Sequence, residues 1–348
     1  MMHPPEASLR LKVERGALEH NWRALDRLSG NAVAGAAVKA NCYGLGAGRC
    51  LPALHEAGCR SFFVAHWSEV EATIAHVPAQ QVSVLHGPLR DEDVAYAKAT
   101  GVVPVINSLT QARRWTMSGG GICHLMIDTG INRLGLSPHD LGDPLISNLQ
   151  VDVVMSHLAN ADEDSPFNAQ QLEAFRACVP QVPHQRCSLA NSAGIALGSE
   201  FAFDLTRPGL ALYGGIPRPE LAQELHQVAH LEAAIIQTRV LKPGDRVGYN
   251  GEYVAERQIT VGTISLGYAD GLLRSRGPGT ALQQGTAKLP ILGKVSMDMV
   301  VVDLSAAPHL KEGDWLEVPF NLPNAAQQSA LSQYELLTTL GARWGGAI

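Results

Sequence analysis

The chain has 348 residues, of which 46% are hydrophobic and 17% are charged. That composition suffices to bury one large core and a smaller one, and it excludes an intrinsically disordered chain. The formal net charge of −6 argues against nucleic acid or another polyanion as a partner.

No stretch of the sequence is apolar for long enough to span a bilayer, and the first residues lack the apolar segment of a secretion signal. We therefore expect no membrane partner and a cytoplasmic location. The six cysteines include no C-x-x-C pair, which argues against a zinc site or a redox motif. We expect them to be small core residues, and we expect no metal ion.

The first part of the chain alternates short apolar runs with helical patterns. Strands are predicted at residues 9–13, 33–38, 61–65, 82–85, 102–106, 123–127, 151–156, 186–190 and near 206–213. Helices are predicted at residues 15–28, 49–58, 91–100 and 169–178, with a further helix beginning at Ser68. This alternation indicates βα units and a parallel sheet. A strand count close to eight favours a TIM-type barrel over an open doubly wound sheet, which remains the alternative.

The character of the sequence changes from Leu231 onward. Strands are predicted at residues 231–240, 258–265, 287–292, 299–304 and 315–318, and a helical pattern returns only at 329–340. The fold class is therefore α/β, with an N-terminal (β/α)8 barrel and a C-terminal all-β domain. We place the barrel at residues 9–225 and the β domain at 226–348, and we expect residues 1–8 to pack with the β domain.

A lysine stands at the end of the first barrel strand, where Lys39 is followed by Asn41, Gly44 and Gly46. A lysine at the end of a buried strand is costly unless its ammonium reaches water or is used chemically. A desolvated lysine loses its charge readily and can then act as a Schiff-base amine. Composition alone does not choose between these alternatives.

The residues around Lys39 read VKANCYGLG, which resembles VKANAYGHG, the pyridoxal-phosphate lysine motif of the alanine racemases. The resemblance implies that Lys39 holds the cofactor covalently and that Tyr43 reaches its phosphate. Eight further segments resemble motifs of the same family, in the same order along the chain.

Two of these segments imply residues beside the cofactor ring. DTGINRLG at residues 128–135 resembles D-T-G-x-x-R-x-G, which implies that Arg133 binds the cofactor's phenolic oxygen and the substrate carboxylate. A guanidinium fork suits paired oxygen atoms better than a lysine does. His157 lies in a segment similar to S/T-H-x-A, which implies a place in the pocket wall against the ring.

Two more segments imply a phosphate site and a partner for the ring nitrogen. ANSA at residues 190–193 resembles the segment whose serine binds phosphate, here Ser192. RPGLALYG at residues 207–214 resembles R-x-G-I-A-x-Y-G, so the backbone N–H groups of Gly209 and Leu210 would complete the phosphate cradle. Arg207 would face the pyridine nitrogen. Arginine keeps its proton, so the ring stays a weak electron sink, which favours reprotonation at Cα over transamination.

The β domain carries the remaining resemblances. VGYNG implies that Tyr249 is the second base, although a phenol with a pKa of ~10 needs neighbouring cations to act near neutrality. GYADG implies that Tyr268 lines the substrate entryway, and SMDM implies a backbone contact from Met297 to the substrate. Tyr334, in a Y-E pair, is implied to close the phosphate site.

Three positions depart from the family pattern. Leu45 stands where a histidine is usual, and Lys294 stands where an arginine is frequent. Met126 stands seven residues before Arg133, where many members carry a carbamylated lysine that orients the arginine. Because methionine cannot carry a carbamate, we expect a backbone carbonyl, the side-chain amide of Asn132 or a bound anion to orient Arg133 instead.

Together the resemblances imply a pyridoxal-phosphate-dependent alanine racemase, with Tyr249 and Lys39 as its two bases. They also imply a role in supplying D-alanine for peptidoglycan, and a homodimer with shared active sites. A racemase of broader specificity, serine included, is the alternative function. Two further rivals are a barrel decarboxylase of basic amino acids, against which Arg207 argues, and a non-enzymatic single-barrel cofactor protein, which would lack the β domain.

Overall fold

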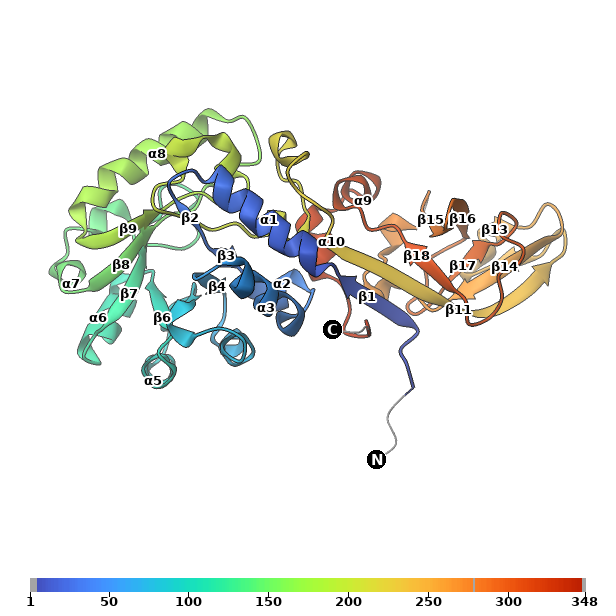
Figure 1. The fold of residues 1–348 in the computed structure, drawn as a ribbon, viewed down its shortest axis with the longest axis horizontal. Helices are drawn as coiled ribbons and strands as arrows, with labels where there is room; N and C mark the ends of the chain where they lie inside the picture. Colours follow the sequence, from blue (N-terminus) through green and yellow to red (C-terminus); the bar gives the residue numbers. More distant parts are fainter. Residues whose placement is uncertain (1–4, 278, 346–348) are drawn as a thin grey trace. The chain divides into compact units, whose positions relative to one another are not determined.

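Parallel strands form a closed ring in the unit that spans Arg15–His226 (Figure 1). This is a computed structural model, and it describes residues 5–277 and 279–345. Seven strands pair in the order β3-β4-β5-β6-β7-β8-β9, and β10 pairs with β2, which precedes β3 across Gly35. A bridge between Asn191 and Arg207 joins the segment after β9 to the end of β10. Counting β2 and β3 as one strand position, the ring has eight positions, as the sequence predicted.

The barrel strands are short and nearly all buried. Their bounds are β2 Val33–Ala34, β3 Ala36–Ala37, β4 Phe62–Val64, β5 Val82–Val84, β6 Val103–Ile106, β7 Ile122–Met126, β8 Gln150–Met155, β9 His184–Ser188 and β10 Leu205–Thr206. The helices that alternate with them are α1 Arg15–Leu28, α2 Lys39–Tyr43, α3 Ala47–Ala57, α4 Val70–Ile74, α5 Asp91–Thr100, α6 Leu109–Met117, α7 Pro144–Ser147 and α8 Pro166–Cys178. The predicted βα alternation is therefore confirmed.

Apolar side chains from opposite strands fill the inside of the barrel. The central cluster joins residues of β4, β6, β7, β8 and β10, and consists of Phe63, Val105, Met126, Val153, Met155 and Leu205. Burial of these large side chains is the main contribution to the free energy of folding of this unit. The filled interior leaves the carboxyl ends of the strands as the place where polar side chains gather.

The second unit combines the chain up to Glu14 with the chain from Gln227 onward. Its antiparallel strands are β1 Leu9–Val13, β11 Ala229–Leu241, β14 Ile259–Ile264, β15 Ala281–Gln284, β16 Ala287–Leu292, β17 Val300–Asp303 and β18 Trp315–Val318. The sheet order is β1-β11-β14-β17-β16-β15-β18, and an extra pairing of β11 with β18 closes it into a small barrel. The hairpin of β12 (Arg246–Val247) and β13 (Tyr253–Val254) is separate from this sheet.

The position of β1 corrects one expectation. We placed Leu9–Val13 in the first domain, but β1 pairs antiparallel with β11, with Leu11 opposite Leu231. The first unit therefore begins at Arg15, because the partner of β1 lies more than two hundred residues away in sequence. Ser8 also contacts this unit through a 2.7 Å hydrogen bond to Ser265, while residues 1–4 lie outside the described residues.

Two short helices end the described chain. The helical pattern at 329–340 corresponds to α10, Gln333–Thr338, and α9, Leu322–Ser329, was not predicted. Asn321 caps α9 by accepting the N–H of Asn324 at 3.2 Å, so the signal for its start was present in the sequence.

Within residues 5–277 and 279–345, no helix has both the length and the apolar character needed to cross a bilayer.

The barrel interior generates a prediction about stability. Met155 is fully buried at the end of β8, so Met155→Ala should lower the free energy of unfolding by about 2–5 kcal/mol through the cavity it leaves. Urea unfolding followed by circular dichroism measures this. Met117→Ala is the control, because Met117 is 82% exposed on α6 and its truncation should change stability by less than about 0.5 kcal/mol. Equal effects of the two substitutions would contradict the assignment of Met155 to the core.

Candidate active site

Lys39 follows the carboxyl end of β3 and begins a turn of unusual hand. The four residues after it, Ala40 to Tyr43, have φ angles of 53°, 54°, 54° and 55°, so α2 is a left-handed turn made without glycine. Such a conformation costs about 1–2 kcal/mol per residue and persists only where the surroundings impose it. The Cys42 N–H donates to the Val38 carbonyl at 2.9 Å, and the Asn41 side chain accepts the Ala47 N–H at 2.8 Å. These bonds fix the backbone of the turn that follows Lys39.

The charges around Lys39 favour its neutral amine. Burial lowers the pKa of the Lys39 ammonium most, and the guanidinium groups of Arg133 and Arg207 lower it further. Glu69 acts in the opposite direction. The structure thus brings together a lysine and two arginines that lie far apart in the sequence.

His157 belongs to the same cluster. It follows β8, and burial, with help from Arg207, Arg133 and Lys39, lowers the pKa of its imidazole to about 3. The side-chain amide of Gln171 donates to the His157 carbonyl at 3.0 Å. His157 therefore presents a neutral ring near neutral pH, which suits packing against a flat ligand better than proton transfer.

Arg207 carries a buried charge and is 7% exposed. Its guanidinium donates to the Ser188 hydroxyl and to the Ser156 carbonyl, and its backbone N–H donates to the Ala190 carbonyl at 2.9 Å. Burial lowers its pKa to about 10, so it remains protonated near neutrality. Sequence reasoning found Arg207 but missed Ser156, at the end of a predicted strand, and Ser188, in the middle of another.

A cradle of hydroxyl and N–H groups lies beside Arg207. The Ser192 hydroxyl accepts the N–H of Gly209 at 2.8 Å and that of Ala211 at 3.2 Å. A Cβ at Gly209 would collide with the Tyr43 hydroxyl, so only glycine lets these groups converge. The expected N–H donors were Gly209 and Leu210. In the structure the N–H groups of Gly209 and Ala211 donate to Ser192, and the expected phosphate contact of Leu210 stays a prediction. Hydroxyl and N–H donors around a glycine fit an anion such as a phosphate.

Tyr213 supports this cradle, and sequence reasoning gave it no role although it lies inside a quoted motif. Its hydroxyl donates to the Ala37 carbonyl at 3.0 Å, and its ring centroid lies 4.8 Å from that of Tyr43. Burial raises the pKa of the Tyr213 phenol, so it stays a donor. It thereby fixes Tyr43 next to the end of β3.

The loop after β7 holds Arg133 at the surface of this chain. The Asp128 carboxylate accepts the N–H groups of Gly130 at 2.8 Å, Asn132 at 3.1 Å and Arg133 at 3.0 Å. The Asn132 side-chain nitrogen donates to the Gly130 carbonyl at 3.1 Å, so it shapes the loop. Met126 is 6% exposed and packs in the barrel interior. What orients the Arg133 guanidinium stays a prediction.

The second unit brings two of its predicted segments together. The N–H of Tyr268 donates to the Ser296 carbonyl at 3.1 Å, and that of Ala269 donates to the Met297 carbonyl at 3.0 Å. A Cβ at Gly267 would collide with the Met297 carbonyl, so this close approach requires glycine.

Tyr249 begins a 3-10 turn, Tyr249–Gly251, and is 64% exposed. Gly248, just before it, lies near the backbone of Lys294, within 4 Å of where a Cβ would stand. Lys294 forms a 2.7 Å ion pair with Glu252. Tyr334 lies on α10 and is 43% exposed.

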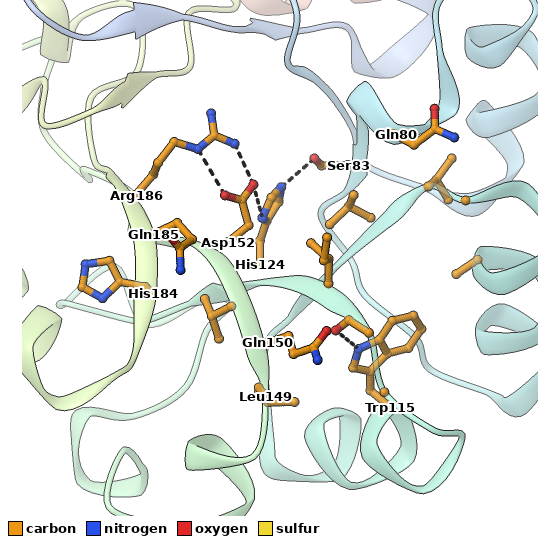
Figure 2. Close-up of a pocket in the computed structure, with 18 of the residues that line it drawn as sticks. Gln80, Ser83, Trp115, His124, Leu149, Gln150, Asp152, His184, Gln185 and Arg186 are labelled. Atoms are coloured by element: carbon orange, nitrogen blue, oxygen red, sulfur yellow. Dashed lines mark hydrogen bonds and ion pairs between the residues drawn. The ribbon is translucent and has the colours of Figure 1, made fainter.

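A separate pocket of about 980 Å³ lies at the amino ends of β5, β7, β8 and β9 (Figure 2). Figure 2 shows a polar chain in which Arg186 pairs with Asp152 at 2.6 Å and His124 bonds to Ser83 at 3.0 Å. Burial lowers the pKa of His124 to about 4, so its ring is neutral. Lys39 is not among the lining residues, and barrel enzymes react at the carboxyl ends of their strands, so this pocket is not the candidate active site.

All six cysteines are buried and free of disulfides, and burial raises the pKa of Cys59 and Cys123 to about 12. Across the part of the chain that the structure describes, no three His, Cys, Asp or Glu side chains are grouped to hold a metal ion.

Comparisons with known proteins agree along the whole chain. Residues 13–217 match the sequence model of the alanine racemase N-terminal domain, and residues 228–346 match that of the C-terminal domain. An alanine racemase of Acidiphilium cryptum is 40% identical, with 99% of this chain and 98% of that protein covered. A catabolic alanine racemase of Agrobacterium fabrum is 38% identical, with coverages of 97% and 91%.

Solved structures agree with the fold. Alanine racemase from Bartonella henselae with covalently bound pyridoxal phosphate has a TM-score of 0.89 and 34% identity, with 99% of each chain covered. The biosynthetic alanine racemase from Pseudomonas aeruginosa has a TM-score of 0.87 and 32% identity, with coverages of 98% and 99%. A match to both domains excludes the single-barrel alternative, and none of these relatives is a decarboxylase. The chain belongs to the alanine racemase family.

Proposed function

We propose that this chain interconverts L-alanine and D-alanine with pyridoxal phosphate, using Lys39 and Tyr249 as its two bases. The observation that carries the proposal is the cluster at the carboxyl ends of the barrel strands. There, burial and two arginines keep the Lys39 amine from holding its proton tightly. The enzyme is thus an isomerase, and the alternative of broader substrate range is not favoured by its relatives.

The residues at the strand ends fit the cofactor. Ser192, Tyr43 and the N–H of Gly209 lie together and have the chemistry to bind a phosphate, and Arg207 would supply a protonated donor for the ring nitrogen. His157 would lie against the ring. Leu210 and Tyr334 would complete the phosphate site, and Lys39 would hold the cofactor covalently. When bound, pyridoxal phosphate withdraws electrons from the substrate and weakens its Cα–H bond.

The two bases move one proton on each face of Cα. The deprotonated phenolic oxygen of Tyr249 takes the proton from L-alanine, and the protonated Nζ of Lys39 delivers a proton to the opposite face. The two residues exchange these roles in the reverse direction. Arg133 holds the substrate carboxylate, with a backbone contact from Met297 and with Tyr268 at the entryway. Arg207 keeps its own proton and moves none.

We further propose a cytoplasmic homodimer in which Tyr249 of one copy serves Lys39 of the other, in an isologous arrangement. The exposure of Tyr249 supports this, because a base has to be covered from water when it acts. The product D-alanine would supply peptidoglycan synthesis. The net charge of −6 argues against nucleic acid as a partner, and no membrane partner is proposed.

The reaction itself can be tested directly. Purified protein incubated with single L-amino acids and pyridoxal phosphate should convert L-alanine to an equal mixture of enantiomers, measured by chiral chromatography. L-Serine under the same conditions should react more slowly. Comparable rates on serine and alanine would establish the broader-specificity alternative, and no D-alanine would contradict the proposal.

The cofactor lysine gives a second prediction. Borohydride reduction of the purified holoenzyme should fix the cofactor on Lys39, with the modified peptide identified by mass spectrometry. Lys39→Ala should lose the visible absorbance band and retain no cofactor after reduction, while Lys12→Ala should keep both, because the Lys12 side chain is exposed on β1. Normal covalent retention in Lys39→Ala would refute the assignment.

Subunit mixing tests the shared site. Lys39→Ala and Tyr249→Phe should each be inactive, and their mixture should regain activity because a hybrid dimer has one site with both residues intact. Exchange can be verified with two differently tagged chains. Inactive hybrids after verified exchange would show that each chain uses its own lysine and tyrosine.

A further inference from the structure

Glu69 connects the ends of two neighbouring barrel strands. It ends a 3-10 turn, Trp67–Glu69, and its carboxylate accepts three backbone N–H groups. One oxygen accepts that of Ala40, next to Lys39, and the other accepts those of Ala65 at 2.8 Å and His66 at 2.9 Å. Because β3 and β4 pair side by side, one carboxylate ties the segments that follow both strands.

The bond to Ala40 lies at the start of the left-handed turn. Ala40 is the first of four consecutive residues with positive φ, and Lys39 immediately precedes it. A backbone held in a disfavoured conformation needs fixed partners at its ends. Glu69 is such a partner, and it comes from the segment that follows β4, whereas the turn follows β3.

The same carboxylate contributes charge to the lysine. The charged groups that act on Lys39 are Arg133, Arg207 and Glu69, and only Glu69 among them favours the ammonium form. Two imidazoles also face this region, those of His157 and His86. Burial lowers the pKa of both, that of His157 to about 3, and His66 packs edge-on against His86 with centroids 4.2 Å apart. Neither ring adds positive charge near neutrality.

We propose that Glu69 is a positioning residue for Lys39, which fixes the turn behind the lysine and supplies the negative charge that balances the two arginines. This inference rests on the proposed role of Lys39 as the reacting lysine. A lysine that both delivers and removes a proton has to reach both protonation states during turnover. With Arg133 and Arg207 alone, its ammonium would be disfavoured, and Glu69 restores access to it.

The consequence has a definite sign. Removing the Glu69 charge destabilises the ammonium, so the pKa of Lys39 should fall. The reaction from D-alanine needs a neutral Lys39 as its base. The rate of this reaction should therefore begin to rise at a lower pH in the variant than in the wild type. A purely structural role would instead lower activity at every pH without moving the profile.

The decisive measurement is made on Lys39 itself. Full-length chain freed of cofactor is methylated with ¹³C-formaldehyde, and the Lys39 resonance is identified by its absence in Lys39→Ala. Its titration should give a lower pKa in Glu69→Gln than in wild type, with Glu69→Asp in between because its shorter side chain keeps the charge farther away. Glu71→Gln is the matched control, since Glu71 is exposed on the adjacent α4 and should leave the titration unchanged.

Each outcome decides the question. An identical Lys39 titration in wild type and folded Glu69→Gln would overturn the proposal. Should that variant fail to fold, Glu69→Asp carries the same test, and a wild-type titration there overturns it equally. The measurement does not depend on racemisation. A failure of the proposed function would appear as an active Lys39→Ala, which is a separate result.

Discussion

The candidate site depends on one buried charge, the guanidinium of Arg207. An arginine taken out of water without partners would cost several kcal/mol, and the barrel meets this cost with the Ser156 carbonyl and the Ser188 hydroxyl. Both partners follow or end strands of the ring, so the charge can be held only if the ring closes. Once held, it acts on its neighbours, because burial and Arg207 together lower the pKa of both Lys39 and His157. The chemistry of the site thus follows from the closure of the barrel.

The sequence predicted the barrel well because its information is local. Periodicity located helices such as Arg15–Leu28 and Asp91–Thr100 to the residue, and apolar runs located most barrel strands within a few residues. The run at 206–213 was wrong as a strand, because only Thr206 belongs to β10 and Leu210–Tyr213 form a 3-10 turn. The sequence also failed for Leu9–Val13, because a strand pattern says nothing about which distant strand is its partner. Motif resemblance supplied the residues proposed for the site. It could not supply Ser156, Ser188 or the function of Glu69, whose roles arise from contacts across the ring.

The two ends of the barrel use buried histidines in the same electrostatic state and for different purposes. At the amino ends, burial keeps His124 neutral. One ring nitrogen accepts the Val153 N–H at 3.3 Å and the other bonds to Ser83, so both are used in hydrogen bonds within the barrel. At the carboxyl ends, burial lowers the pKa of His157 most, and Arg207, Arg133 and Lys39 lower it further. A lowered pKa therefore does not by itself mark a functional histidine. Arginines act on both rings, and Lys39 acts on His157 alone of the two.

The second base poses the complementary electrostatic problem. A phenol acts as a base near neutrality only when cations lie close to it. Within its own unit, the lysine beside the Tyr249 turn is Lys294, and that lysine is already paired with Glu252 at 2.7 Å. The charge of Lys294 is therefore largely compensated. The barrel unit, in contrast, holds Arg207 and Arg133 at its strand ends, with Glu69 as the carboxylate that acts on Lys39. Under the proposed shared site, the arginines that disfavour the Lys39 ammonium would also favour the Tyr249 phenolate. The two arginines would then lower the pKa of both bases, and Glu69 would limit the decrease in the pKa of Lys39.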